Sequence, residues 1–398
     1  MKILDKGICS IDSIQASGYK EGKYGVTIIY HENSTAVGVY TKNKVYAAPI
    51  DITKKHLENG KISAIIVNSG NANCYTKEDG IKKGLELAQL TADTLNIPVE
   101  EVAVASTGVI GRQMPMDILK PVATQSLSLL GNSRLNADAA ANAILTTDLV
   151  PKECAVEHSL DDGTTFKVAG ICKGSGMIAP NMGTMLGFIT TDLKVPQEVM
   201  QEALRESVKK SFNMVVVDGD ESTNDTVLLM STNEKEGAYD PNFQEALDYV
   251  CISLAKQIAR DGEGAKKFME VRANGAQTLD DAICISKSIV SSSLVKTAVA
   301  GADPNWGRII SAMGYSGVDF DPDNVSISIG DENEDIVIVD KGNVTTYDNP
   351  ELLESAEEVM KKETIIITVD LHDGNESATA YGCDLTYDYV RINAEYTT

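Results

Sequence analysis

Two stretches of the chain place apolar residues at the three- and four-residue steps of an amphipathic helix. The first stripe consists of Ile81, Leu85, Ala88, Ala92 and Leu95, and the second of Phe243, Leu247, Val250, Leu254 and Ile258. We expect each stripe to pack against a sheet. A third helix is predicted to start after Pro196, because proline suits a first turn, and to end near Phe212.

Strands are predicted where β-branched and other apolar residues form short runs between polar turns. The runs are AIIVN (64–68), VAVAS (102–106), VSISI (325–329), DIVIV (335–339) and TIIITVD (364–370). Strands and helices alternate without a repeat or a low-complexity linker, which predicts an α/β or α+β layered protein. The 398 residues are enough for two or three domains, or for one large domain with a satellite.

The chain has a large excess of acidic residues, with 35 lysines and arginines against 58 aspartates and glutamates and a net charge of -23. Such a balance repels phosphate backbones and anionic lipid head groups, so we expect neither a nucleic-acid partner nor a membrane surface. An acidic excess is typical of a solvated surface. It would also attract a cationic substrate such as a diamino acid.

Seven cysteines are scattered along the chain, and no two of them are spaced C-x-x-C. This argues against a disulfide framework or a zinc site and favours a reducing compartment. The first residues, MKILDKGICSID, lack an apolar segment, and no run approaches the roughly 18 apolar residues of a membrane span. We therefore expect a cytoplasmic protein.

The usual catalytic motifs are missing from the sequence. Its four histidines lack a metal-ligand spacing, and there is no G-x-S-x-G, no P-loop and no G-x-G-x-x-G after a strand. What remains is a set of polar glycine-rich turns, any one of which is typical of an ordinary loop. Together they indicate the walls of one small-molecule site: NSGNANC (68–74), STGVIG (106–111), KGSGM (173–177), DGDEST (218–223), DGEGA (261–265) and GADPNWG (301–307).

The Gly183-Thr184 pair offers another kind of chemistry. A threonine hydroxyl is a poor nucleophile unless a base takes its proton, and the α-amine of an N-terminal threonine can be that base. This amine titrates at about 7.7 to 8.0 when unperturbed. Glycine has no Cβ, so it would let the Thr184 hydroxyl approach the preceding carbonyl for self-cleavage through an N-to-O acyl shift. Alternatively, Thr184 simply begins an apolar strand.

Six segments, taken in order, resemble the ornithine acetyltransferase family, also called the bifunctional glutamate N-acetyltransferases of arginine biosynthesis. They are STGVIGRQMPMD, KGSGMIAPNMGTMLGFITTD, DGDESTNDTVLL, DGEGA, AGADPNWGRI and the tail CDLTYDYVRINAEYTT. The likeness runs from ASGYKEGKYGV, near residue 16, to the last residue. It implies the αββα sandwich of self-processing N-terminal-nucleophile peptidases, with a smaller C-terminal α/β part.

The resemblance also implies roles for individual residues. Thr184 would be the nucleophile, exposed by autocleavage after Gly183 into an α chain of residues 1–183 and a β chain of residues 184–398. Thr107 and Gly108 would form the oxyanion hole, in which a hydroxyl and a backbone N–H in a glycine turn can face a developing negative charge without reorganising.

The implied substrate site draws on residues from both future chains. A lysine suits the carboxylate of an amino acid and a glutamate suits its ammonium group. The residues implied in binding are Thr147 (with Thr146 as an alternative), Lys173, Thr184, Glu263, Asn393 and Thr398. Because chain termini normally fray, a tail that supplies ligands needs its own contacts, and YVRIN is predicted to be a strand that provides them.

The implied reaction moves the acetyl group of N-acetylornithine to glutamate through an acetyl-threonine ester, without a metal or organic cofactor. Some family members also accept acetyl-CoA, and the resemblance leaves this donor open here. It further implies a heterotetramer of two α and two β chains.

Four residues depart from the family pattern: Gly183 replaces the usual alanine, Lys266 a threonine, and Met214 and Thr397 arginines. Two other functions remain as alternatives. One is a self-processing aminopeptidase or amidase of the same fold, and the other is a binding protein that keeps the site but is never cleaved.

Overall fold

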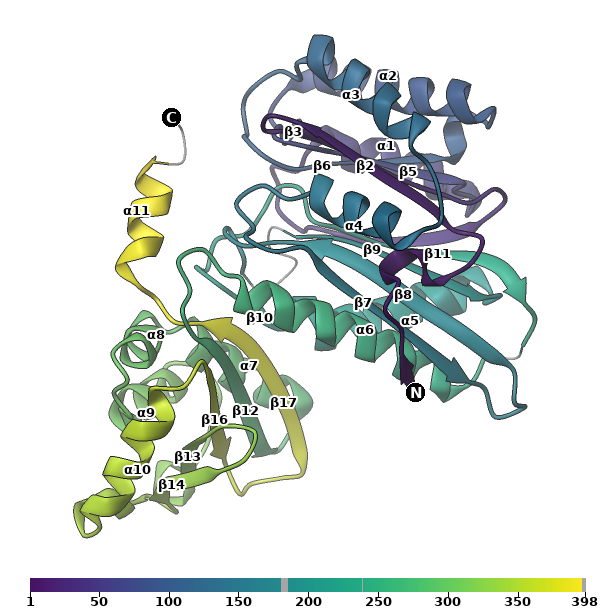
Figure 1. Ribbon diagram of the computed structural model, residues 1–398. Helices are drawn as coiled ribbons and strands as arrows, with labels where there is room; N and C mark the ends of the chain where they lie inside the picture. The colour runs from purple at the N-terminus through teal and green to yellow at the C-terminus, as the bar shows by residue number, and fades with distance from the viewer. Residues whose placement is uncertain (180–184, 238, 396–398) are drawn as a thin grey trace. The chain divides into compact units, whose positions relative to one another are not determined.

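The computed structural model describes residues 1–179, 185–237 and 239–395. The chain divides into two compact units (Figure 1). The first comprises Met1–Asn213 and Asp220–Leu254, and the second comprises Met214–Gly219 and Ala255–Thr398. Residues 183 and 184 both fall within the range of the first unit, so the expected cleavage point is not the boundary between the units.

The first unit contains two sheets, built from β1 (Lys2–Ile3), β2 (Gln15–Glu21), β3 (Tyr24–Tyr30), β4 (Thr35–Tyr40), β5 (Ala64–Ser69), β6 (Val102–Ser106), β7 (Lys152–Ser159), β8 (Thr165–Lys173), β9 (Leu186–Leu193) and β11 (Thr226–Lys235). The four-stranded sheet has the order β2-β3-β5-β6, with β5 and β6 parallel. The six-stranded sheet has the order β1-β7-β8-β9-β11-β4, with β9 and β11 parallel. The strands predicted at 64–68 and 102–106 are confirmed as β5 and β6.

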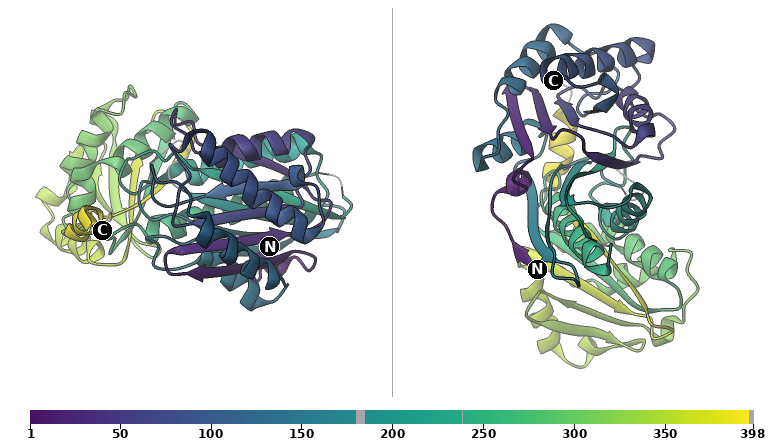
Figure 2. Two further views of the ribbon diagram at one scale, coloured as in Figure 1. Left: turned by 90° about the horizontal axis from the view of Figure 1, so that it is seen from above. Right: turned by 90° about the vertical axis from the view of Figure 1, so that its right-hand side faces the viewer.

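Three helices cover the outer face of the four-stranded sheet (Figures 1 and 2): α1 (Ala48–His56), α2 (Lys77–Leu95) and α3 (Met116–Ser128). Ile52 of α1, Leu87 of α2 and Val122 of α3 share one core with Ile28 and Ile66 of the sheet. This buried apolar surface fixes the outer layer of the unit.

The predicted apolar stripe of α2 is only partly correct. Ala88 and Ala92 are buried as expected, whereas Ile81 and Leu85 are 37% and 40% exposed. Gly84 lies on the buried face, where an added Cβ would come within 2.6 Å of Cδ1 of Ile52 in α1. The close approach of α1 thus favours burial of the small residues of α2, which the spacing of its large apolar residues does not reveal.

A second core lies between the two sheets. It includes Val67 of β5, Ala105 of β6, Ile171 of β8 and Phe188 of β9. The helix α4 (Arg134–Ala143) contributes alanines to this layer. It approaches β2 so closely that a Cβ added at Gly18 would come within 2.0 Å of a backbone oxygen of the helix.

Helices α5 (Gln197–Lys210) and α6 (Pro241–Arg260) confirm the two remaining helix predictions. Helix α5 packs on β4. The thiol of Cys172 in β8 donates to the Leu254 carbonyl of α6 at 3.8 Å, and the rings of Phe166 and Phe243 lie 6.0 Å apart. With helices outside both sheets, the first unit is the expected αββα sandwich.

The second unit has a seven-stranded sheet of order β10-β17-β12-β16-β13-β14-β15. Its strands are β10 (Val215–Val216), β12 (Phe268–Ala276), β13 (Ser326–Gly330), β14 (Asp335–Asp340), β15 (Asn343–Val344), β16 (Thr364–Asp370) and β17 (Glu376–Cys383). Its helices are α7 (Leu279–Ser291), α8 (Ser293–Ala300), α9 (Trp306–Gly314), α10 (Pro350–Met360) and α11 (Tyr387–Glu395). The strands predicted at 325–329, 335–339 and 364–370 are confirmed.

The strand predicted at YVRIN is wrong, because these residues belong to helix α11. The Thr386 hydroxyl accepts the N–H of Asp388 at 3.2 Å and so satisfies a backbone donor at the start of the helix. Tyr387 is 95% exposed and Val390 is 64% exposed, so the apolar residues of this segment are not buried as they would be in a sheet.

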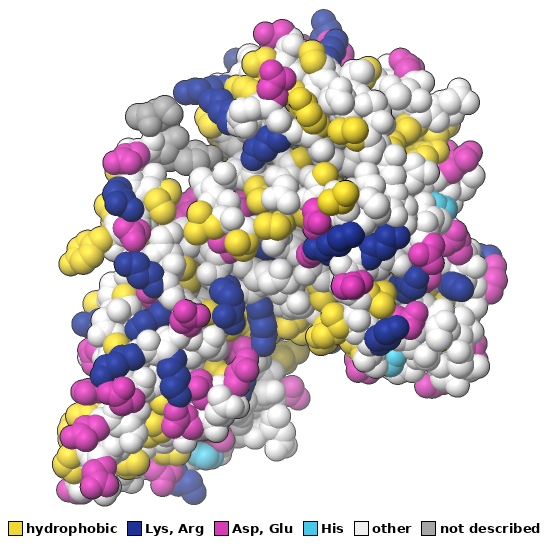
Figure 3. Space-filling model, in the orientation of Figure 1, with side chains coloured by type: hydrophobic (Ala, Val, Ile, Leu, Met, Phe, Trp, Pro, Cys, Tyr) yellow, Lys and Arg dark blue, Asp and Glu magenta, His cyan; other side chains and the backbone are white. Residues whose placement is uncertain are grey.

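The surface in Figure 3 shows acidic and basic side chains interspersed, without a single acidic patch on this face. In the described ranges, no single helix has the length and apolar composition to cross a membrane. Helices α7 and α8 reach these limits only when taken together, and they meet at a bend of 56°.

Candidate active site

Two of the predicted glycine-rich turns lie side by side in the first unit. They follow β5 and β6, which run parallel with Asn68 paired to Ser106, so both turns leave the same edge of the sheet. A third loop joins them through Asn224, whose side-chain nitrogen donates to the carbonyls of Ala72 at 2.6 Å and Ser106 at 2.8 Å. Asn224 is buried, so these bonds fix the three loops against one another.

The predicted oxyanion residues occupy the turn after β6. Thr107 is buried, and its N–H donates to the Asn68 carbonyl at 2.9 Å. Because the Thr107 N–H is already bonded, the predicted donors to the oxyanion are the Thr107 hydroxyl and the Gly108 N–H. Gly108 has a φ of 131°, and an added Cβ would lie 2.5 Å from the backbone nitrogen of Asn71, so no other residue fits this turn.

Lys173, the predicted carboxylate anchor, lies at the end of β8 in a buried ion cluster. Its side chain is 2% exposed, and its ammonium nitrogen lies 3.5 Å from Oδ2 of Asp148. Lys152 approaches Oδ1 of the same carboxylate at 2.8 Å, and neither of these two side chains is exposed. Two ammonium groups therefore approach the same buried carboxylate.

The electrostatics of Asp148 reflect this arrangement. Burial acts to raise its pKa, but Lys173, Lys152 and the N–H of Gly174 together hold the pKa well below its usual range. The Gly174 N–H donates to Oδ1 at 2.7 Å, and the Thr146 N–H donates to Oδ2 at 3.2 Å. Asp148 thus stays ionised and connects the KGSGM loop to the loop that carries Thr146 and the half-buried Thr147.

The expected cleavage junction, Gly183 and Thr184, lies outside the described residues, and so does Thr398. The strands that precede and follow the junction in the sequence, β8 and β9, are neighbours in the six-stranded sheet. Lys173 at the end of β8 is in register with Leu186 at the start of β9, and the two strands are antiparallel neighbours. The N–H of Met185 donates to Oδ1 of Asp225 at 2.9 Å.

The remaining predicted ligands belong to the second unit. Glu263 is 9% exposed, and its Oε2 accepts a hydrogen bond from the side-chain nitrogen of Asn393 in α11 at 2.8 Å. The Thr386 hydroxyl donates to the Gly264 carbonyl at 2.7 Å. A Cβ added at Gly264 would lie 2.4 Å from the backbone nitrogen of Tyr389. The tail is therefore held against the DGEGA loop, as expected, although by a helix rather than a strand.

The GADPNWG turn, predicted to be part of the site, has structural contacts within the second unit. The Asn305 side chain accepts the N–H of Arg308 at 3.1 Å and caps helix α9. The Arg308 guanidinium donates to the Leu294 carbonyl at 2.8 Å. These contacts explain the motif as the start of helix α9.

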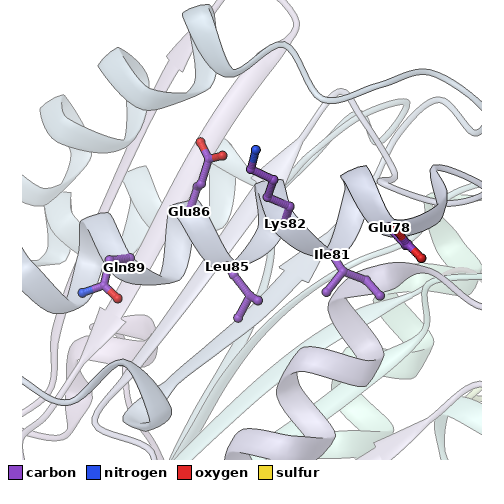
Figure 4. Close-up of a pocket in the computed structure, with 6 residues that line it drawn as sticks. All are labelled: Glu78, Ile81, Lys82, Leu85, Glu86 and Gln89. Carbon is purple, nitrogen blue, oxygen red and sulfur yellow. The ribbon is translucent and has the colours of Figure 1, made fainter.

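A hollow lined by α2 contains none of the predicted site residues. Figure 4 shows its lining, in which all six side chains come from this one helix: Glu78, Ile81, Lys82, Leu85, Glu86 and Gln89. It is a shallow surface feature of an exposed helix face. The described ranges also contain no group of three or more His, Cys, Asp or Glu side chains placed to hold a metal ion.

The sequence reasoning missed Asp148, Asn224 and Asp225. Asp148 directly follows the predicted ligand Thr147, and the other two lie within the motif DGDESTNDTVLL. The motifs identified the loops, but only the structure shows that these side chains are buried and which groups they bond.

The sequence matches the ArgJ family over residues 12–398. This chain belongs to the ArgJ family. Its relatives include proteins named glutamate N-acetyltransferase from Methanothermobacter thermautotrophicus, 51% identical with 100% of this chain and 99% of the relative covered, and from Methanocaldococcus jannaschii, 49% identical with 100% of both covered. Membership of the ArgJ family makes this protein an acyltransferase.

Solved ArgJ-related structures align with parts of the chain. The arginine biosynthesis bifunctional protein argJ from Bacillus halodurans is 42% identical, with 52% of this chain and 96% of that chain covered and a TM-score of 0.47. The ornithine acetyltransferase from Mycobacterium tuberculosis, complexed with ornithine, is 33% identical, with 45% and 97% covered and a TM-score of 0.42.

Proposed function

We propose that this ArgJ protein is a glutamate N-acetyltransferase that moves the acetyl group of N2-acetylornithine to glutamate through an ester on Thr184. The observation that carries the proposal is the full-length match, at about half identity, to proteins named for this activity. The same match favours the acyltransferase over the aminopeptidase or amidase alternative.

The charges of the first unit support an amino-acid substrate. Lys173 is buried at the end of β8, and a lysine ammonium suits the carboxylate of an amino acid. The α-carboxylate of acetylornithine or glutamate is such a group. We propose that Lys173 binds it with help from Thr147, and that Glu263 and Asn393 bind the ammonium end of the substrate, together with Thr398.

The proposed reaction has two half-reactions. The α-amine of Thr184 takes the proton of the hydroxyl, whose oxygen attacks the acetyl carbonyl carbon. Thr107 and Gly108 donate hydrogen bonds to the resulting oxyanion. The carbon–nitrogen bond then breaks, and ornithine leaves with the proton from the Thr184 ammonium. The amine of glutamate then attacks the ester carbonyl carbon, and the bond between that carbon and the Thr184 oxygen breaks. The α-amine of Thr184 carries the proton from the glutamate nitrogen to the Thr184 oxygen, and N-acetylglutamate departs.

Self-cleavage between Gly183 and Thr184 would precede this chemistry and yield chains 1–183 and 184–398. The sheet of the first unit supports the survival of a cleaved enzyme. Strands β9 and β11, which belong to the future β chain, lie between β8 and β4 of the future α chain. The two chains would therefore stay paired through backbone hydrogen bonds. We further propose a cytoplasmic heterotetramer of two α and two β chains.

The test is a denaturing gel with N-terminal sequencing. The purified protein should give two fragments instead of one of 42.7 kDa, and the second should begin TMLGF. Thr184→Ala should remain whole and inactive, whereas the matched control Thr190→Ala in β9 should still be cleaved. A cleaved Thr184→Ala protein would show that the nucleophile lies elsewhere.

Activity is then measured with acetylornithine and glutamate, and separately with acetyl-CoA and glutamate. Acetylglutamate formed from acetylornithine supports the proposal. Release of free acetate without acetylglutamate would instead identify a hydrolase. The acetyl-CoA arm decides whether the enzyme also uses this donor.

A further inference from the structure

Asn224 is a buried residue of the first unit to which the mechanism above gives no role. It lies two residues before Thr226, the first residue of β11, and Thr226 is in register with Leu186 at the start of β9. The side-chain nitrogen of Asn224 reaches the loops of the four-stranded sheet, where it donates to the carbonyls of Ser106 and Ala72. One amide group thus connects the start of two strands in one sheet to the oxyanion turn that follows β6 in the other.

The bond to Ser106 fixes the peptide group that precedes Thr107. The oxygen of this peptide group accepts the Asn224 amide at 2.8 Å, and its N–H, which belongs to Thr107, donates to the Asn68 carbonyl at 2.9 Å. A peptide group is planar, so bonds to both its oxygen and its nitrogen leave it little freedom to rotate. The Cα of Thr107 lies in this plane, so the two bonds fix the backbone that carries the predicted hydroxyl donor.

The bond to Ala72 holds the other side of the same turn. The Ala72 carbonyl accepts the Asn224 amide at 2.6 Å, and the Ala72 N–H donates to the Val109 carbonyl at 3.0 Å. Gly108 lies between these anchors, and a Cβ added to it would lie 2.5 Å from the backbone nitrogen of Asn71. Asn224 therefore holds the chain both before and after the two predicted oxyanion donors.

The Asn224 amide is itself held in one orientation. Its oxygen accepts the Thr223 hydroxyl at 2.6 Å, and the backbone N–H of Asn224 donates to the Ser222 hydroxyl at 3.0 Å. Two carbonyl oxygens need two donors, and the amide nitrogen supplies both from one neutral group. A carboxylate of the same shape would instead turn an acceptor toward these two acceptors.

We propose that Asn224 is a positioning residue for acetyl transfer: its amide holds the turn of Thr107 and Gly108 in the geometry that faces a developing oxyanion. This inference rests on the proposed function, in which these two residues supply the oxyanion donors. Such donors act at about 2.7 to 3.1 Å from the oxyanion, and a displacement of about 0.5 Å is enough to weaken them. Because the oxyanion exists only during the reaction, losing the Asn224 amide should reduce kcat and not substrate binding.

The first measurement is the kinetics of Asn224→Leu, which has a similar size and no hydrogen-bonding groups. Folding is checked by circular dichroism, and kcat is expressed per cleaved molecule counted on a denaturing gel. We expect kcat for acetyl transfer to fall about tenfold or more and the KM for acetylornithine to change less than about twofold. If Asn224→Leu does not fold, Asn224→Ala replaces it, because the vacated space admits water that can bond to the two carbonyls.

Asn132→Leu is the matched control. The side-chain nitrogen of Asn132 also bridges two backbone carbonyls of the first unit, those of Ile11 at 2.9 Å and Cys9 at 3.2 Å. None of the predicted site residues is bonded to this side chain among the described residues. The control should lose stability but keep kcat per cleaved molecule within about twofold of the wild-type value.

The second measurement combines Asn224→Leu with Thr107→Ala. If Asn224 acts through the oxyanion turn, the two losses in kcat should combine to less than their product, because the hydroxyl that Asn224 positions is already absent. Asn132→Leu combined with Thr107→Ala should give the full product. A full product for the Asn224 pair would overturn the proposed route through the turn.

The outcomes separate this inference from the proposed function. If the wild-type protein does not transfer acetyl groups, both proposals fail. If it does, and a folded Asn224 variant keeps the wild-type kcat or raises KM as much as it lowers kcat, only the role of Asn224 is overturned. If neither Asn224 variant folds, this residue serves the fold and the positioning role is likewise overturned.

Discussion

Asp148 and Asp225 are both buried acids of the first unit, yet their surroundings are opposite. Asp148 lies between the ammonium groups of Lys152 and Lys173, and its pKa is held below its usual range. Asp225 has a backbone N–H on one oxygen and no bond on the other within the described structure, and its pKa is raised. Burial therefore does not by itself set the charge of an acid, because the charges that surround it decide.

The difference lies in the partners that each carboxylate has among the described residues. Two ammonium groups approach Asp148, at 2.8 Å from Lys152 and 3.5 Å from Lys173. Asp225 instead accepts a backbone N–H from Met185.

The largest expected effect comes from removing the charge of Asp148. Asp148→Asn leaves two buried lysines without their carboxylate, and breaking a buried ion pair costs about 3 to 5 kcal/mol of stability. Asp225→Asn should not lower the free energy of unfolding at neutral pH, because the raised pKa of Asp225 means that ionising this acid opposes folding. Urea unfolding followed by circular dichroism measures both, and equal losses would contradict the comparison.

The pH dependence of stability should differ in sign between the two acids. The pKa of Asp148 is lowered on folding, so its contribution is complete above about pH 4 and is lost as the pH falls through the folded pKa. The pKa of Asp225 is raised, so its contribution declines as the pH rises from about 4 toward the folded pKa. This second trend should be clearest in Thr184→Ala, which keeps the chain whole, and should disappear when Asp225→Asn is added.

The sequence predicted the layers of the fold better than the details of burial. Runs such as 64–68 and 102–106 were identified as strands because they are continuously apolar, as buried strands are. The exposed Ile81 of α2 was misjudged, because helical spacing alone does not show where a neighbouring helix approaches. The tail was misjudged because the cap at Thr386 depends on a contact with Gly264, which is distant in sequence.

The roles of Thr107 and Gly108 stay predictions, made from the motif STGVIG. The structure adds a physical reason for the glycine, which has a positive φ and a close backbone contact. Asp225 was not identified from the sequence, because the burial of a carboxylate is a property of packing. A buried acid and a surface acid are the same letter in a sequence.

The next largest effect tests the oxyanion turn. Thr107→Ala should lower the kcat for acetyl transfer by about a hundredfold, which is the usual loss for one oxyanion donor, with little change in KM. The matched control Thr53→Val removes another buried threonine hydroxyl of the first unit, one that donates to the Val104 carbonyl, and should reduce stability rather than kcat per folded molecule. Near-normal turnover by Thr107→Ala would remove this hydroxyl from the proposed mechanism.

The smallest expected effect concerns the tail, where charge and burial are both weaker than around Asp148. Asn393 donates to Glu263 at 2.8 Å from the exposed helix α11, so its loss removes a single bond to a carboxylate. Asn393→Ala, or deletion of residues 396–398, should raise the KM for acetylornithine about tenfold, as expected for one hydrogen bond to a charged group. Arg391→Ala, which removes an exposed pair with Asp388 in the same helix, should change KM less than twofold. Cleavage at Thr184 should continue in all three proteins, because it needs only the junction and its oxyanion donors. If the shortened enzyme binds acetylornithine as tightly as the full chain, the tail plays no part in substrate binding, and the buried charges of the first unit carry recognition without it.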